Sequence, residues 1–156
     1  MHTVYLSLGT NLGRRRSNIS RAITIIREQI GTIVRQSALY ETEPWGFSSK
    51  KKFINAAICV MTELTPHQLL AATQAIEREL GRTHKTKKAA DGKPADGTTY
   101  LDRIIDIDIL LYDDETIDEP DLKIPHPLMY EREFVMKPLR EIMPDAATMI
   151  TTAATR

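Results

Sequence analysis

The chain has 156 residues, of which 42% are hydrophobic and 27% charged, a size and composition that suit one domain with a single core. Lysine plus arginine equals aspartate plus glutamate at 21 each, so the net charge gives no support for a nucleic-acid or membrane partner. Cys59 is the only cysteine, which excludes an intrachain disulfide, and its apolar neighbours favour a buried strand in a reducing compartment. Without a signal-peptide pattern or a long apolar run, we expect a cytoplasmic protein with one domain over residues 1–156.

The first half of the chain predicts a strand, a helix and two further strands. Apolar and polar residues alternate over 3–8, which indicates a strand that ends at a turn over 9–13. Apolar residues then recur at helical spacing over 19–30, and Gly31 is placed to cap that helix. Residues 33–40 and 53–63 are expected to form the second and third strands.

The second half begins with a helix-start signal. Thr65 can cap a helix, Pro66 suits its first position and Gln68 completes a capping box. We expect this helix to end at Gly81 after burying one face, made of Leu69, Thr73, Ile76 and Leu80. A strand over 104–112, a turn-rich excursion and an apolar helix over 134–142 complete the chain.

The order of these elements predicts the fold class. A β-α-β-β-α-β order with a C-terminal elaboration is typical of a ferredoxin-like α+β sandwich, with helices on the faces of an antiparallel sheet. The segment 83–103 has no apolar pattern and is expected to be a long mobile loop. Between Arg82 and Arg103 it carries six lysines or arginines against three aspartates, so it is either a basic functional loop or a solvated insertion.

Two aspartates interrupt the apolar strand predicted over 104–112. Asp106 and Asp108 are two residues apart, so in a strand they point to the same side. Adjacent carboxylates repel, and a bound cation removes that conflict; oxygen ligands of this kind suit Mg²⁺. The alternative is a solvent-facing strand with two harmless surface aspartates. Regular alternation would put Arg103 on the opposite side, so its participation requires irregular backbone before Ile104.

A second group of residues suits a flat heterocycle. Aromatic surface and an amide come together in the segment 40–46, which contains Trp45, and in Phe53 and Asn55 on one side of the next strand. An ordinary core role is the alternative for the aromatic rings. In addition, His126 is held between two prolines in a restricted loop.

Five ordered blocks carry a resemblance to a known family. The blocks are GTNL (9–12), YETEPWG with FINAA (40–46 and 53–57), TQAIE with GR (73–77 and 81–82), DRIIDIDILLYDD (102–114) and IPHPLMYEREFVMKPLREI (124–142). Together they resemble the 6-hydroxymethyl-7,8-dihydropterin pyrophosphokinases over nearly the whole chain. The resemblance implies a ferredoxin-like α+β fold and transfer of pyrophosphate from ATP to the hydroxymethyl group of the pterin, a step of folate biosynthesis.

The resemblance also implies roles for individual residues. Asp106 and Asp108 would hold two Mg²⁺ ions, and Arg82 and Arg103 would assist the transfer. The pterin would contact Thr42, Pro44, Trp45, Phe53, Asn55 and Phe134. ATP would contact Gln74, Glu77, His84, Tyr100, Ile109, His126 and Arg132, where His84 and Tyr100 replace an arginine and a tryptophan of the best-known members.

Two other functions remain compatible with the residues alone. A Mg²⁺-dependent phosphodiesterase or nuclease would use the aspartate pair but would leave the heterocycle-binding group unexplained. A non-catalytic ligand-binding domain of the same fold would need neither aspartate. The expected partners are small-molecule substrates, with no nucleic acid and no membrane, and the protein is expected to act as a monomer.

Overall fold

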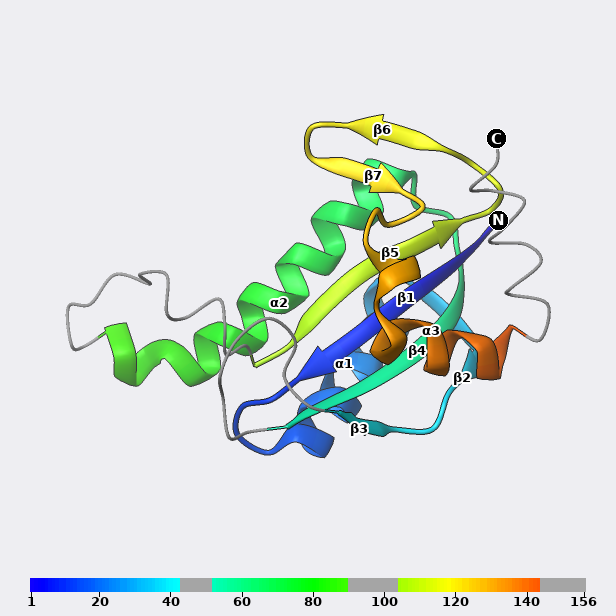
Figure 1. Ribbon diagram of the computed structural model, residues 1–156. Helices are drawn as coiled ribbons and strands as arrows, with labels where there is room; N and C mark the ends of the chain where they lie inside the picture. Colours follow the sequence, from blue (N-terminus) through cyan, green and yellow to red (C-terminus); the bar gives the residue numbers. More distant parts are fainter. Residues whose placement is uncertain (43–51, 90–103, 144–156) are drawn as a thin grey trace.

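The computed structural model describes residues 1–42, 52–89 and 104–143, and for 82–89 the helical backbone alone. Its centre is an antiparallel sheet in the order β2-β4-β1-β5, with β3 paired to β4 (Figure 1). The bounds of these strands are β1 His2–Thr10, β2 Gly31–Gln36, β3 Tyr40–Thr42, β4 Phe53–Thr62 and β5 Asp106–Tyr112. This order and the α+β arrangement confirm the predicted fold class.

Helices cover both faces of the sheet. The helices α1 (Arg15–Gln29) and α2 (Pro66–Ala89) pack together on one face, over a core that includes Leu6, Ile26 and Ile58. The opposite face carries α3 (Glu133–Ile142), whose apolar side packs on β4 and β5 (Figure 1). Alternation along β1 explains the division, because Val4, Leu6 and Leu8 enter the first core while the intervening residues face the other way.

The connection between β5 and α3 contains short elements that the sequence did not predict. A hairpin of β6 (Ile117–Glu119) and β7 (Leu122–Ile124) is followed by the 3₁₀ helix η1 (Met129–Glu131). The peptide bond between Ile124 and Pro125 is cis. The hairpin is attached to the main core by Leu122 and Ile124, which are 5% and 1% exposed.

The predicted start of α2 is confirmed. The Thr65 hydroxyl accepts a hydrogen bond from the Gln68 N–H at 3.2 Å, and the Gln68 side chain accepts one from the Thr65 N–H at 2.9 Å. This is the reciprocal pattern of a capping box. The predicted buried face, Leu69, Thr73, Ile76 and Leu80, is also confirmed, with no member more than 2% exposed.

Two predictions about glycines are wrong. The helix α2 does not end at Gly81 but continues to Ala89, so residues 83–89 are helical and not part of a loop; the three lysines and Ala89 in this stretch favour helix. Gly31 does not cap α1, which ends at Gln29 with Ile30 as its C-cap residue; Gly31 begins β2. A Cβ at Gly31 would lie 2.0 Å from the Met61 carbonyl oxygen, so this glycine permits close approach of β2 to β4.

The remaining corrections concern strand bounds. The predicted strand over 33–40 is divided into β2 and β3, because Ser37 leaves the ladder and bonds to Ala57 in both directions: its N–H donates to the Ala57 carbonyl, and its hydroxyl accepts from the Ala57 N–H. Cys59 is a buried free thiol on β4, as predicted.

No helix in the described ranges is long and apolar enough to span a bilayer.

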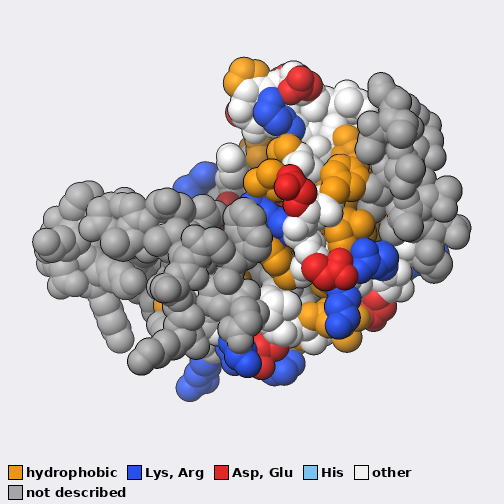
Figure 2. Space-filling model, in the orientation of Figure 1, with side chains coloured by type: hydrophobic (Ala, Val, Ile, Leu, Met, Phe, Trp, Pro, Cys, Tyr) orange, Lys and Arg blue, Asp and Glu red, His pale blue; other side chains and the backbone are white. Residues whose placement is uncertain are grey.

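The surface that carries α3 shows mixed charge. In Figure 2, acidic and basic side chains of the described residues lie beside one another with apolar side chains between them, and no large patch of one sign is visible on this face. The ion pair between Arg140 on α3 and Glu133, at 2.6 Å, is one example.

Candidate active site

Asp106 and Asp108 begin β5, on the sheet face opposite α1 and α2. Both are partly buried, while Ile107 and Ile109 between and beyond them enter the core on the other side. Their common direction confirms the geometric part of the sequence prediction. Both residues belong to β5, the edge strand of the sheet, and α2 passes beside this strand (Figure 1).

A third carboxyl group joins this pair. The Glu77 side chain on α2 accepts a hydrogen bond from the Ile107 N–H at 2.7 Å and is also hydrogen-bonded to Asp106. The pKa of Glu77 is raised to about 7, chiefly by burial and also by the negative charges of Asp106 and Asp108, against the opposing effect of the Ile107 N–H. Three carboxyl groups thus lie together, and a divalent cation would offset the repulsion between their negative charges. Their all-oxygen donor set suits Mg²⁺.

Basic groups lie on the other side of the aspartates. The His126 Nε2 atom is 4.0 Å from the Asp108 Oδ1 atom. The backbone N–H of His126 donates a hydrogen bond to the Leu110 carbonyl at 3.1 Å. Burial lowers the pKa of His126, and the charge of Arg132 lowers it further, although Asp106 acts in the opposite direction. A neutral imidazole therefore stands next to the acidic cluster, and the Arg132 guanidinium is close enough to this imidazole to affect its pKa. Phosphate oxygens would find donors here.

The register of the sheet connects the aspartates to the heterocycle-binding group. On β1, Gly9 is paired with Asp106 on one side and with Asn55 on the other, and Ser7 is paired with Asp108 and Ala57. Directly paired residues share a face, so Asn55 and Asp106 point to the same side with Gly9 between them. The floor between the amide and the carboxylate consequently has no side chain.

Gly9 is also in close contact with the amide. A Cβ at this position would lie 2.9 Å from the Asn55 Oδ1 atom and 3.9 Å from the Phe53 ring. Asn55 is only 3% exposed and donates to the Thr42 hydroxyl at 2.8 Å, which fixes the orientation of its amide. The first residue of the GTNL block must therefore be glycine, because any larger residue would collide with the Asn55 amide.

The other described residues of the predicted site occupy different surroundings. The Arg132 guanidinium lies 5.8 Å from the centre of the Phe134 ring, which packs beside α3 residues and Leu110. Gln74 is exposed on α2. Ile109 is 5% exposed and its side chain belongs to the main core, so only its backbone is available to a ligand.

Six residues of the predicted site have side chains outside the described part of the structure. Pro44, Trp45, Tyr100 and Arg103 lie outside the described residues. Arg82 and His84 are on the helical backbone of α2, but the positions of their side chains are outside the description.

The backbone just before β5 bears on the prediction for Arg103, although the segment before Ile104 lies outside the described residues. The strand begins only at Asp106, and Ile104 and Ile105 both pack into the same core cluster, which a regular strand does not allow for neighbouring residues. The backbone is thus irregular immediately before the aspartates.

The sequence did not predict a role for one residue near the site, Arg15. Arg15, in the first turn of α1, uses its Nη1 atom to donate to Glu41 on β3 and to the Lys52 carbonyl just before β4, both at 2.8 Å. It ties α1 to the two strands that carry Thr42, Phe53 and Asn55. No local pattern announces such a contact, because its partners are distant in the chain.

The fold matches that of domains in solved structures. An HPPK-DHPS structure in complex with substrates aligns with a TM-score of 0.69 at 16% identity, over 92% of this chain and 40% of that one. A structure of Plasmodium falciparum HPPK-DHPS gives a TM-score of 0.68 at 19% identity, over 92% and 42% of the two chains. These alignments establish the fold, an α+β domain with an antiparallel sheet.

The sequence comparisons identify the family. The model of the 7,8-dihydro-6-hydroxymethylpterin-pyrophosphokinase (HPPK) family matches residues 5–144. The 2-amino-4-hydroxy-6-hydroxymethyldihydropteridine pyrophosphokinase of Porphyromonas gingivalis is 46% identical over 92% of both chains, and that of Bacillus subtilis 37% identical over 97% of this chain and 84% of its own. The mitochondrial folate synthesis bifunctional protein of Arabidopsis thaliana is 36% identical over 97% of this chain and 25% of its own.

The chain belongs to the HPPK family. It is an ATP-using pyrophosphokinase of folate biosynthesis, as the resemblance of its sequence blocks implied.

Proposed function

We propose that the enzyme joins its two substrates across β1, with the pterin over Asn55 and the ATP phosphates over Asp106 and Asp108. The reaction would transfer pyrophosphate from ATP to the hydroxymethyl oxygen of 6-hydroxymethyl-7,8-dihydropterin, giving AMP and the pterin diphosphate. The observation that carries this proposal is the register that puts Asn55 and Asp106 on one face, on either side of Gly9. Substrates bound to these residues would meet over a floor without a side chain.

The pterin side would be read by fixed polar atoms. The Asn55 amide is held by Thr42 and is nearly inaccessible to bulk water, so its remaining hydrogen-bonding capacity suits the edge of a heterocycle. Phe53 and Phe134 offer aromatic surface at this end of the sheet. Pro44 and Trp45 are assigned to the pterin by resemblance alone.

The phosphate side would be organised by charge. The closeness of the Glu77, Asp106 and Asp108 carboxyl groups supports Mg²⁺ binding at the two aspartates, and the family resemblance implies two ions. When bound, Mg²⁺ supplies positive charge that neutralises the triphosphate and lowers the barrier to displacement. Glu77 would keep the start of β5 in position through its bond to the Ile107 N–H.

Donors of the chain itself would complete the phosphate site. His126 and Arg132 would bind phosphate oxygens, Gln74 the nucleotide, and Ile109 would contribute its backbone. Arg82, Arg103, His84 and Tyr100 are assigned to ATP and to the transfer step by resemblance. By excluding water, these residues would favour attack by the pterin hydroxyl over hydrolysis.

We also propose that the protein acts as a monomer in the cytoplasm. Within the described residues, one chain supplies Thr42 and Asn55 on the pterin side and both aspartates on the phosphate side. The free, buried Cys59 suits a reducing compartment.

Formation of AMP tests the proposal. The wild-type protein with ATP and Mg²⁺ should release AMP only when the hydroxymethylpterin is present; AMP released equally without it would favour a phosphodiesterase and refute the proposal. Asp106→Ala and Asp108→Ala should each lower turnover by on the order of 100-fold or more, because each removes a charged ligand of the phosphate site. Asp118→Ala is the matched control, since this exposed carboxylate on β6 pairs only with Lys123 among the described contacts.

A further inference from the structure

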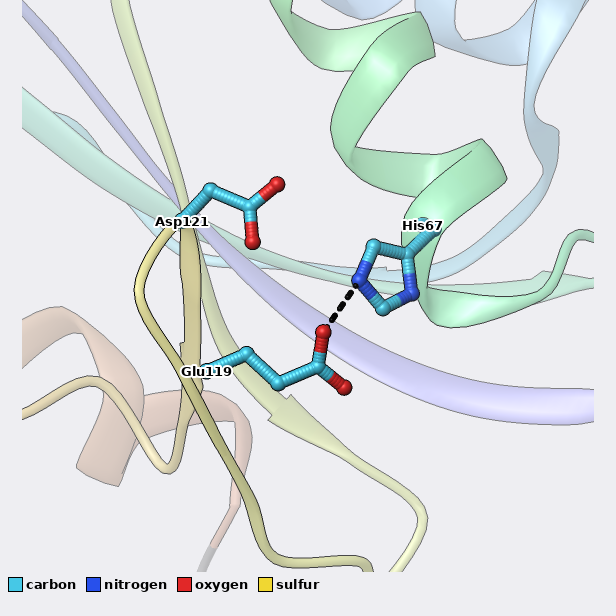
Figure 3. A group of neighbouring side chains, drawn as sticks. All are labelled: His67, Glu119 and Asp121. Carbon is cyan, nitrogen blue, oxygen red and sulfur yellow. Dashed lines mark hydrogen bonds and ion pairs between the residues drawn. The ribbon is translucent and has the colours of Figure 1, made fainter.

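A second group of metal-ligating side chains lies away from the active site. His67, Glu119 and Asp121 each offer one ligand atom, and these atoms all lie within 4.8 Å of one another. Figure 3 shows both carboxylates directed toward the imidazole, from a hairpin that faces the first turn of α2. His67 precedes Glu77 on the same helix by a distance of about 15 Å at the usual rise per residue. This group is therefore distinct from the acids around Asp106.

The three residues are held by ordered elements. His67 follows Pro66 and lies inside the capping box of α2, where the helical backbone is already fixed. Glu119 is the last residue of β6, and Asp121 is the second residue of the two-residue turn before β7. Because Leu122 and Ile124 anchor this hairpin in the core, the two carboxylates are presented by a supported turn. The ligand set thus needs little ordering when it binds an ion.

One ligand pair is already formed. The His67 Nε2 atom and the Glu119 Oε1 atom are 2.9 Å apart, although the two residues are far apart in the sequence. The positive end of the α2 dipole opposes a cation here, and the two carboxylates offset it. Lys123, the basic residue of β7, is engaged with Asp118 at 2.6 Å. Among the described contacts, Lys123 is therefore engaged away from Glu119 and Asp121.

The donor chemistry selects the class of ion. Mg²⁺ prefers oxygen ligands, whereas an imidazole combined with carboxylates is typical of Zn²⁺ and other divalent transition metals. We propose that His67, Glu119 and Asp121 form a binding site for a divalent transition-metal ion, which joins the start of α2 to the β6–β7 hairpin. Water would complete the coordination at this exposed position. The ion would stabilise the contact between these two elements and would take no part in pyrophosphate transfer.

Calorimetric titration with Zn²⁺ tests this site. Excess Mg²⁺ is present throughout to occupy the carboxylates around Asp106. The wild-type protein should bind a single Zn²⁺ ion in addition to Mg²⁺, and His67→Ala and Asp121→Asn should weaken binding by more than about tenfold, since even outer-shell changes have effects of that size. His2→Ala is the matched control. His2 forms a similar pair with Asp113, at 2.8 Å, but among the described residues no third metal-ligating side chain joins that pair.

Thermal unfolding gives an independent readout. Zn²⁺ should raise the melting temperature of the wild-type protein and of His2→Ala, and should have no such effect on His67→Ala. Pyrophosphokinase activity of His67→Ala should equal that of the wild type, which verifies that the variant is folded. Absence of Zn²⁺ binding by the wild type, or equal binding by His67→Ala, would overturn the proposal without affecting the assignment of the active site.

Discussion

The substitution Gly9→Ala adds one methyl group to the floor between the two proposed subsites. Its Cβ would lie 2.9 Å from the Asn55 Oδ1 atom, closer than such atoms approach in proteins, so the Asn55 amide must move. That movement acts against the 2.8 Å hydrogen bond from Asn55 to Thr42. A hydrogen bond of this kind contributes about 0.5–1.5 kcal/mol net, which corresponds to a change in affinity of roughly two- to tenfold.

The assay is pterin binding in the presence of Mg²⁺ and a non-hydrolysable ATP analogue. We expect the dissociation constant of the pterin to rise by that factor, while the affinity for the ATP analogue alone stays unchanged, because Asp106 and Asp108 are not displaced. Gly81→Ala is the matched control: it has no atom within 4 Å of its added Cβ and lies inside α2. Unchanged pterin affinity in Gly9→Ala would refute the reasoning that the Asn55 amide recognises the pterin.

Two further predictions concern Glu77 and Arg15. The pKa of Glu77 is raised from 4.5 to about 7, chiefly by burial, so the folded state resists ionisation of this carboxyl group as pH rises through that interval. Without metal, the free energy of unfolding of the wild type should therefore fall relative to that of Glu77→Gln over the same interval, by on the order of 3 kcal/mol in all. Denaturant unfolding at several pH values measures this difference, which Mg²⁺ should reduce; parallel curves for the two proteins would contradict it. Arg15→Ala removes both ties from α1 to the strands around Thr42, so the KM for the pterin should rise severalfold with little change in the KM for ATP. Arg16→Ala, an exposed neighbour, should leave both KM values unchanged, and equal effects of the two variants would show that general loss of charge is responsible.

Features set by neighbours in the chain were predictable from the sequence. The capping box of Thr65 and Gln68 needs only four consecutive residues, and the buried face of α2 needs only helical spacing. The common direction of Asp106 and Asp108 likewise follows from the period of a strand. Each of these depends on local backbone geometry alone.

Features set by packing between distant segments were not predictable. The roles of Gly31 and Gly81 were misjudged because a glycine can end a helix, permit close approach or do neither, and only the surrounding structure decides. The three-residue strands β6 and β7 are too short to show a period. The alignment of Asn55, Gly9 and Asp106 depends on strand register, which no single segment encodes.

The position of Gly9 on a central strand fixes the distance between the two proposed subsites. Asn55 and Asp106 lie on the two strands that flank β1, so their backbones are separated by two inter-strand spacings, or roughly 9–10 Å. Hydrogen-bonded ladders fix that spacing within narrow limits, whatever conformation the surrounding loops adopt. Changes in the loops can therefore alter how tightly each substrate is held, while the separation of the amide from the carboxylate is inherited from the sheet.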